Sequence, residues 1–130
     1  MSAKKILVAD DDKVTLETLG AQLRGVGFQV VTAMDAMQAF MIAQRALPDV
    51  VVLDIQMPGG TGLDTLKRDT LKRLRTSTKT QAIPVIAISA HPKLGPQATA
   101  LGAVEFLAKP VDFARLRGTL DRLLAPPPEK

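Results

Sequence analysis

Short apolar runs alternate with longer stretches of helical periodicity along this chain of 130 residues. The strand-like runs lie near residues 5–9, 29–33, 50–54, 85–89 and 104–108. Between them, the spacing of apolar residues predicts helices near 13–25, 36–46, 62–76 and 112–124. The runs at 50–53 and 85–88 are apolar throughout, which is typical of strands buried on both faces. The alternation predicts an α/β fold, a doubly wound parallel sheet of five strands flanked by about five helices.

Two helix starts and one weak segment stand out within this scheme. Asp35 and Gln38 have the spacing of a capping box, and Asp112 is a good N-cap for the last helix. The segment 90–103 contains two prolines and two glycines. Any helix there should therefore be short, near 96–101, and weakly stabilised by intrinsic propensity.

The third helical stretch contains a repeat of five residues. Residues 64–68 read Asp-Thr-Leu-Lys-Arg, and residues 69–73 repeat them at once. Five residues turn an α-helix by about 500°, so the second copy is rotated by about 140° from the first. The two copies cannot present leucine to the same strip of core. We expect a helix extended toward residue 75, in which the second copy adds basic surface without evident core value and Lys72, Arg73 and Arg75 are largely exposed.

Composition limits the class of protein. The apolar content of 46% indicates one globular domain, which we place at residues 1–125, followed by a Pro-rich tail at 126–130. The chain has no cysteine, which excludes a disulfide framework and a thiolate metal site. No apolar run approaches the roughly 18 residues of a membrane span, and the first residues lack the apolar region of a signal peptide. We therefore expect a cytoplasmic protein without a membrane partner.

The net charge is +4, and much of the positive excess lies in one region. Its basic residues are Lys67, Arg68, Lys72, Arg73, Arg75 and Lys79. A basic patch can bind nucleic acid, but a solvated helix face is the more ordinary explanation. Because the chain has no Trp or Tyr to stack on bases, we expect no direct role in nucleic-acid binding.

Polar residues follow four of the apolar runs at the point where each run ends. They are Asp10, Asp11 and Asp12 after the first run, Asp54 after the third, Ser89 after the fourth and Lys109 after the fifth. The carboxyl ends of parallel strands share one edge of the sheet, where such folds bind ligands. Several carboxylates together need a cation to offset their repulsion, and oxygen ligands suit Mg²⁺. With a hydroxyl and an ammonium added, the edge could bind a phosphoryl group.

Four segments that carry these residues resemble the receiver domain of two-component response regulators, the chemotaxis-regulator-like fold. They read ILVADDD, VVLDIQMPGGTGL, IAISAH and EFLAKPVD, in this order along the chain. The resemblance covers residues 4 to about 124. It implies the strand order 2-1-3-4-5.

The resemblance also implies the acidic part of the site. Asp54 would be the phosphoacceptor, and Asp11 would bind Mg²⁺ directly, whereas Asp10 would act more through water. The backbone carbonyl of Gln56 would be a further metal ligand. Asp12 would cap the following helix. From the residues alone, the three consecutive aspartates could be turn and cap residues, and Asp54 could be a turn starter.

Four further residues take roles by the same resemblance. Ser89 would contact the phosphoryl group, Lys109 would reach both the carboxylate and the phosphate, and the Lys109–Pro110 peptide bond would be cis. Phe106 would be the switch aromatic, coupled by packing alone because it has no hydroxyl. His91 and Gln56 would flank the phosphoryl group and influence its hydrolysis. Without the resemblance, these positions read as a strand-end hydroxyl, a surface lysine, a core phenylalanine and an exposed loop histidine.

The implied function is a Mg²⁺-dependent phosphorylation switch in two-component phosphorelay signal transduction. A histidine kinase or histidine phosphotransfer protein would donate the phosphoryl group, and the signal would pass to a downstream protein by contact. The domain would organise only its own phosphorylation and dephosphorylation, so it would not be an enzyme acting on another substrate. One alternative is a receiver-like adaptor that works without phosphorylation. An aspartyl phosphatase would need an acidic residue where Gln56 stands.

Overall fold

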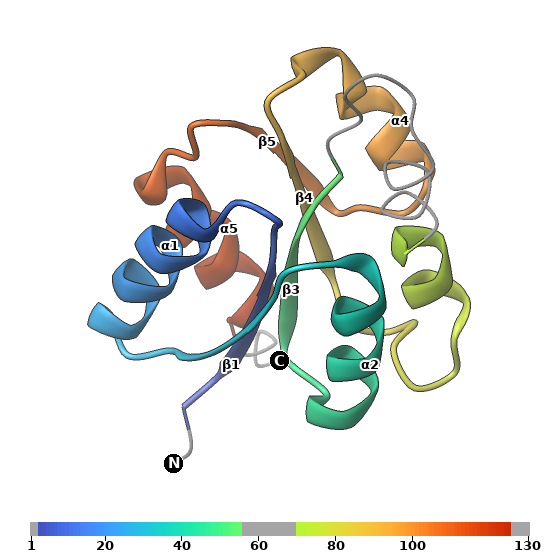
Figure 1. Cartoon of the computed structure of the whole chain (residues 1–130), viewed down its shortest axis with the longest axis horizontal. Coiled ribbons are helices and arrows are strands. Elements are labelled where there is room, and N and C mark those ends of the chain that lie inside the picture. The colour runs from blue at the N-terminus through green and yellow to red at the C-terminus, as the bar shows by residue number, and fades with distance from the viewer. Residues whose placement is uncertain (1–2, 56–69, 126–130) are drawn as a thin grey trace, which may run out of the picture.

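The computed structural model of this chain describes residues 3–55 and 70–125 (Figure 1). Its strands are β1 (Lys5–Ala9), β2 (Gln29–Ala33), β3 (Val50–Asp54), β4 (Val85–Ser89) and β5 (Glu105–Ala108). Its helices are α1 (Lys13–Gly25), α2 (Ala36–Ala46), α4 (Gly95–Ala100) and α5 (Phe113–Leu124), with a 3₁₀ turn, η1, at Pro92–Leu94 and a further helical stretch at 70–76. The strands form one parallel sheet in the order β2-β1-β3-β4-β5, which confirms the predicted fold.

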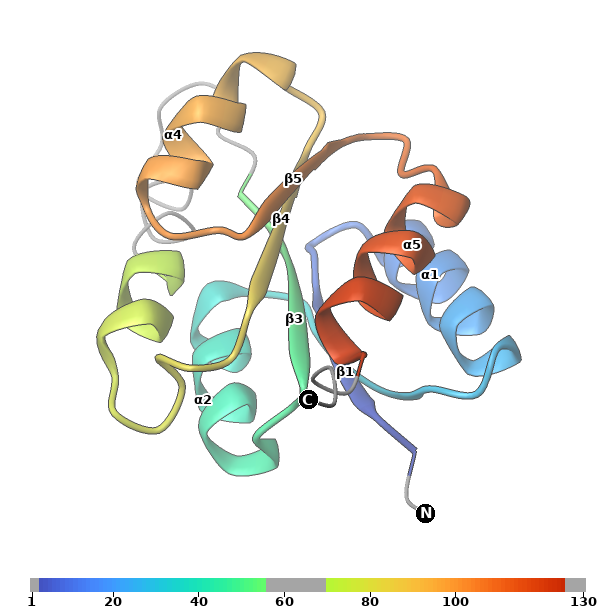
Figure 2. The ribbon, with the colours of Figure 1, turned by 180° about the vertical axis from the view of Figure 1, so that it is seen from behind.

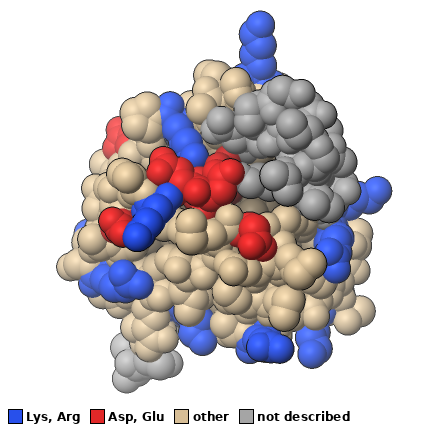
Figure 3. Space-filling model, viewed as in Figure 1, with Lys and Arg blue, Asp and Glu red and all other residues tan. Residues whose placement is uncertain are grey.

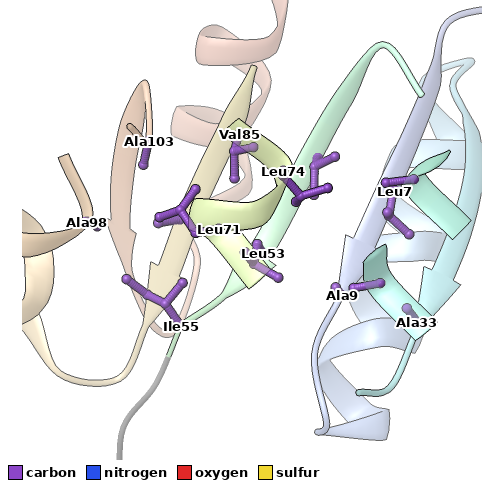
Figure 4. Close-up of a cluster of buried hydrophobic side chains, with 14 residues drawn as sticks. Leu7, Ala9, Ala33, Leu53, Ile55, Leu71, Leu74, Val85, Ala98 and Ala103 are labelled. Carbon is purple, nitrogen blue, oxygen red and sulfur yellow. The ribbon is translucent and has the colours of Figure 1, made fainter. Parts of the chain in front are cut away.

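Helices cover both faces of the sheet (Figures 1 and 2). Helices α1 and α5 lie on one face, whereas α2, the helical stretch 70–76 and α4 lie on the other. Successive side chains of a strand point to opposite faces, so Ile6 and Val8 pack toward α1 and α5, and Leu7 and Ala9 pack into the other cluster (Figure 4). Both faces of the central strands are therefore buried, as their uninterrupted apolar sequences predict.

Local capping explains where several helices begin. Asp12 accepts a hydrogen bond from the Val14 backbone N–H and caps α1. Asp35 accepts from the Gln38 N–H at the start of α2, while the Gln38 side chain accepts from the Met34 N–H. Asp112 caps α5 in the same way. These three caps confirm the sequence predictions and fix the loops that follow β1, β2 and β5.

The repeated segment differs from its prediction. Within the described part of the second copy, Thr70 and Leu71 are buried, and Leu71 packs in the core with Leu74 (Figure 4). The expectation that this copy has no core value is therefore wrong, because its rotation about the helix axis turns Leu71 toward the sheet. Lys72 and Arg73 are exposed as expected. The first copy lies outside the described residues.

Arg75 also departs from the expectation of a free basic side chain. It is half-buried, and its guanidinium donates hydrogen bonds to the carbonyls of Gln81, at 2.6 Å, and Ile83, at 3.3 Å. Its side chain also lies against Gly102, where an added Cβ would come within 2.9 Å of the Arg75 Cγ. Arg75 therefore joins the helical stretch 70–76 to the turn between α4 and β5.

The segment 90–103 forms only short helical pieces, as its prolines and glycines predict. Helix α4 spans six residues and begins one residue earlier than expected. No helix among the described residues is long and apolar enough to cross a membrane.

Candidate functional site

Strand order brings the predicted site residues to one edge of the sheet. Asp10 follows β1, Asp54 ends β3, Ser89 ends β4 and Lys109 follows β5. Backbone hydrogen bonds hold these ends in place: the Asp10 N–H donates to the Ala33 carbonyl at 3.0 Å, and the Lys109 N–H donates to the Ser89 carbonyl at 2.8 Å. The acidic side chains gather on the surface at this edge, with basic side chains beside them (Figure 3).

Three carboxylates form the centre of the site. Asp10, Asp11 and Asp54 each place one oxygen within 4.8 Å of the others. Asp10 and Asp54 are buried, whereas Asp11 is exposed. The carboxylates therefore line a cleft that opens to solvent on the Asp11 side.

Lys109 supplies positive charge to this cluster. Its Nζ lies 2.7 Å from Asp10 Oδ2 and 3.1 Å from Asp54 Oδ2, and its side chain is 15% exposed. Burial alone lowers the pKa of the Lys109 ammonium, but the contacts with Asp10 and Asp54 outweigh burial and raise the pKa above its ordinary value. Lys109 is therefore charged at neutral pH and bridges the two buried carboxylates.

One ammonium does not neutralise three carboxylates. Burial raises the pKa of Asp10 to about 6, although Lys109 and the backbone N–H of Asp12, 2.8 Å from Asp10 Oδ1, both favour the charged form. A divalent cation would offset the remaining negative charge. The donors are all carboxylate oxygens, which fits Mg²⁺. The residues present therefore fit the ion that the sequence predicts.

Ser89 and His91 lie together at the end of β4. Ser89 is fully buried, and its Oγ accepts a hydrogen bond from the His91 backbone N–H at 3.0 Å. The residue His91 is exposed. The Ser89 hydroxyl keeps its own proton for donation to another acceptor, because in this bond it acts only as the acceptor.

Phe106 lies on β5 against the start of α4. Its ring is half-buried, and an added Cβ on Gly95 would come within 3.2 Å of the Phe106 Cδ2. Gly95 thus lets α4 approach the aromatic ring closely. The Lys109–Pro110 peptide bond is cis, as expected. Gln56 lies outside the described residues.

Met34 also borders the site, although the sequence reasoning did not single it out. The cleft is lined by Ala9, Asp10, Asp11, Met34, Asp35, Ala36, Leu53 and Asp54. Met34 follows the last residue of β2, so applying the strand-end rule to the second apolar run would have found it. It forms an apolar rim on the side of the cleft toward α2.

A second hollow, of about 480 Å³, opens on the other side of Lys109. It lies between α1 and the connection from β5 to α5, and it is lined by Asp12, Val14, Thr15, Thr18, Leu19, Gln22, Ala90, Lys109, Pro110 and Val111. Val14 in its wall is strongly exposed. The hollow therefore offers a partly apolar surface directly beside the ion pairs.

The sequence of this chain is similar to that of a known protein family and of its members. The sequence model of the protein family described as the response regulator receiver domain matches residues 6–121 of this chain. The response regulator PleD of Caulobacter vibrioides is 39% identical over 123 residues, which cover 90% of this chain and 26% of PleD. The chain thus spans about a quarter of the length of this curated relative.

Solved structures show the same fold. A response regulator from Chloroflexus aurantiacus has a TM-score of 0.82 at 27% identity, with 96% of this chain and all of that chain covered. The receiver domain of the sensor histidine kinase PA1611 from Pseudomonas aeruginosa has a TM-score of 0.81 at 26% identity, with the same coverage. That structure has a magnesium ion coordinated in its active-site cleft.

Proposed function

Because this chain belongs to the response regulator receiver domain family, we propose that it is a phosphorylation switch in which Asp54 accepts the phosphoryl group. The observation that carries the proposal is the position of the Asp54 carboxylate. It is buried at a strand end, clustered with Asp10 and Asp11, and 3.1 Å from Lys109 Nζ. A carboxylate oriented by charged neighbours is a competent nucleophile.

The proposed donor is a phosphohistidine on a histidine kinase or histidine phosphotransfer protein. An Asp54 carboxylate oxygen forms a bond to phosphorus, while the bond from phosphorus to the imidazole nitrogen breaks. The electron pair of that bond stays on the nitrogen, and Asp54 becomes an acyl phosphate. The hollow beside Lys109 supports this choice, because a protein donor needs contact surface next to the site.

We assign the metal ligands to Asp11 and Asp54, with Asp10 acting more through water and Gln56 providing its backbone carbonyl. When bound, Mg²⁺ would supply positive charge against the oxygens of the transferring phosphoryl group. The three clustered carboxylates support this assignment, as does the magnesium in the PA1611 receiver domain. Asp12 is left to the α1 cap, where its carboxylate already accepts from Val14 and Thr15.

Ser89 and Lys109 would then hold the phosphoryl oxygens. Lys109 already lies between two carboxylates, and Ser89 has a proton to donate. Movement of Ser89 would strain its bond to the His91 N–H and so reach the segment 90–103. Phe106, in contact with Gly95 of α4, would follow by packing and present a changed surface to a downstream protein. His91 and Gln56 would influence the rate of hydrolysis.

Incubation with acetyl phosphate and Mg²⁺ tests the acceptor. Intact-mass measurement should show one added phosphoryl group on the wild type and none on Asp54→Asn. Equal labelling of both proteins would move the acceptor elsewhere. No labelling of the wild type, with or without a histidine phosphodonor, would favour the adaptor that works without phosphorylation.

The metal assignment has its own matched pair of variants. Asp11→Ala should weaken Mg²⁺ binding strongly in calorimetric titration, whereas Asp12→Ala should leave the affinity nearly unchanged and lower the thermal midpoint by removing the α1 cap. A larger loss of Mg²⁺ affinity in Asp12→Ala would show that the ligands are assigned one residue out of register.

A further inference from the structure

Helix α2 and the residues just beyond its two ends expose most of the large apolar side chains found on the described surface. The exposed large hydrophobic residues are Val14, Met34, Met37, Met41, Leu47 and Val104. Four of these six lie on α2 or directly at its ends. Met37 is 71% exposed. Apolar side chains concentrated on one element mark an interaction surface more often than the same number scattered singly.

The exposed face of α2 is well defined. Ala39 and Ala43 are buried against the sheet, so Met37 and Met41, one turn apart, lie on the opposite side of the helix. Along one flank, Arg73 from the neighbouring helical stretch lies over the Phe40 ring, with its guanidinium carbon 4.0 Å from the ring centroid. The surface over α2 is largely uncharged in Figure 3. We call the side of α2 that carries Met37 and Met41 the α2 apolar face; Met34 and Leu47 are exposed just beyond its two ends.

Charges mark the two ends of this face. Asp35 caps the amino end of α2, and Arg45, in the last turn, is the only charged residue within the helix. Both are exposed. The ends of the helix therefore carry opposite charges, separated by about 15 Å along the axis.

The arrangement is nearly symmetric about residue 40. Met37 and Met41 lie three residues before it and one residue after it, Asp35 and Arg45 lie five residues from it in opposite directions, and Met34 and Leu47 lie six residues before it and seven after it. A two-fold interface requires this kind of pattern, because the same patch must complement itself. A second α2, running antiparallel, would place methionine against methionine and aspartate against arginine at both ends.

We propose that the occupant of the α2 apolar face is a second copy of this chain, packed through α2 in an antiparallel, two-fold arrangement. Met37 and Met41 of one copy pack against Met41 and Met37 of the other, and Asp35 of each copy faces Arg45 of the other. Methionine is suited to such a contact because its flexible thioether adapts to its neighbours. The inference does not depend on phosphorylation of Asp54.

One helix face is smaller than a standard protein interface, so the association should be weak. Sedimentation velocity from about 10 µM to about 1 mM covers the range expected for an interface of this size. The weight-average sedimentation coefficient of the wild type should rise with concentration. Met37→Glu should stay monomeric throughout, because the proposed contact would bury an unpaired carboxylate against Met41 of the other copy, once in each half of the interface. Glu in the first turn is compatible with the helix, so circular dichroism should show the variant folded.

Val104→Glu is the matched control, because Val104 is also an exposed apolar residue but lies before β5, away from α2. This variant should associate like the wild type. A wild type that stays monomeric to about 1 mM would overturn the proposal. Association that survives Met37→Glu but is lost in Val104→Glu would overturn it as well, by placing the interface at β5.

Cross-linking tests the geometry independently. Because the chain has no cysteine, Met41→Cys introduces a single thiol close to the proposed two-fold axis. Mild oxidation with copper phenanthroline should convert this variant into a disulfide-linked dimer faster than Val104→Cys at the same concentration. Equal rates for the two variants would contradict the antiparallel α2 contact.

Discussion

Asp10 is the residue at which burial and charge conflict most directly. Its side chain is fully buried, yet it stands beside the carboxylate of Asp54 and shares a single ammonium with it. Burial raises the pKa of Asp10 to about 6, so the folded protein binds a proton there more tightly than the unfolded chain does. Ionisation of Asp10 therefore lowers the free energy of unfolding, and a bound cation would offset this loss.

This shift predicts a pH dependence of stability. Between about pH 4 and pH 6 the folded state binds more protons at Asp10 than the unfolded state, so the free energy of unfolding should fall as pH rises through this window. The loss should be on the order of 2 to 3 kcal/mol. Urea unfolding of the wild type and of Asp10→Asn at several pH values isolates the contribution of Asp10 to this loss, because the variant lacks the titrating group.

Mg²⁺ provides the control for this titration. A bound cation favours the ionised carboxylate, so the fall in unfolding free energy should become shallower when Mg²⁺ is present. Identical pH profiles for the wild type and Asp10→Asn would contradict the raised pKa of Asp10.

At this scale the sequence predicted the charged residues at the strand ends better than Arg75 in the helical stretch 70–76. Asp10, Asp11, Asp54 and Lys109 could be placed together because each lies at the carboxyl end of a strand of a parallel sheet, or just after it. The hydrogen bonds that Arg75 donates to two carbonyls could not be predicted, because they depend on how the loop after residue 76 folds back.

Among the elements, the helical stretch 70–76 shows how far periodicity can be misleading. The repeated five residues indicated extra basic surface, but the structure places Leu71 in the core beside Leu74. A five-residue repeat is out of phase with the helix, so the two copies turn different residues toward the sheet. The sequence alone did not show that the second copy turns its leucine toward the core. The helices with clear caps, α1, α2 and α5, were predicted closely because capping residues fix their starts.

Leu71 therefore should not tolerate truncation. Leu71→Ala should lower the free energy of unfolding by about 2–5 kcal/mol, because it leaves a cavity in the core. Lys72→Ala, its exposed neighbour, should change that free energy by less than about 0.5 kcal/mol. Denaturant unfolding of both variants gives the comparison, and similar small effects would show that Leu71 is not a core residue.

Two glycines make a second comparison between elements. Gly102 has a φ of +108°, and an added Cβ would lie 2.9 Å from the Arg75 Cγ. Gly102→Ala should therefore lower the free energy of unfolding by about 1–3 kcal/mol. Gly118, inside α5, has nothing within 4 Å of an added Cβ, so Gly118→Ala should raise that free energy by about 0.5–1 kcal/mol. Thermal unfolding checks both signs, and a stabilising Gly102→Ala would contradict the close contact with Arg75.

At the scale of the whole molecule, strand order decides which distant residues meet. The alternation of strands and helices was enough to predict a parallel sheet, and resemblance to a known family supplied its order. Neither could supply the contact of Phe106 with Gly95, which depends on the packing of a short helix with weak intrinsic propensity.

Hydrogen exchange should reveal the proposed switch across the molecule. Beryllofluoride with Mg²⁺ should increase protection in 90–103 and around Phe106, because Ser89 at the root of that segment is drawn toward the phosphoryl mimic. Residues 13–25 should change little. Asp54→Asn, which should not bind the mimic in the same way, is the control. Equal exchange with and without the mimic would mean that the output surface lies elsewhere.

The parallel sheet also separates the acidic edge from both described ends of the chain. Strand β1 begins at Lys5 and helix α5 finishes at Leu124, both at the edge opposite Asp54 (Figures 1 and 2). A fluorescent reporter or an affinity tag fused at either end would therefore lie far from the cleft and leave it accessible to a phosphodonor. A sensor of phosphorylation built on this scaffold should instead carry its dye on the α4–β5 side, since the fusion points lie a full strand length from the chemistry.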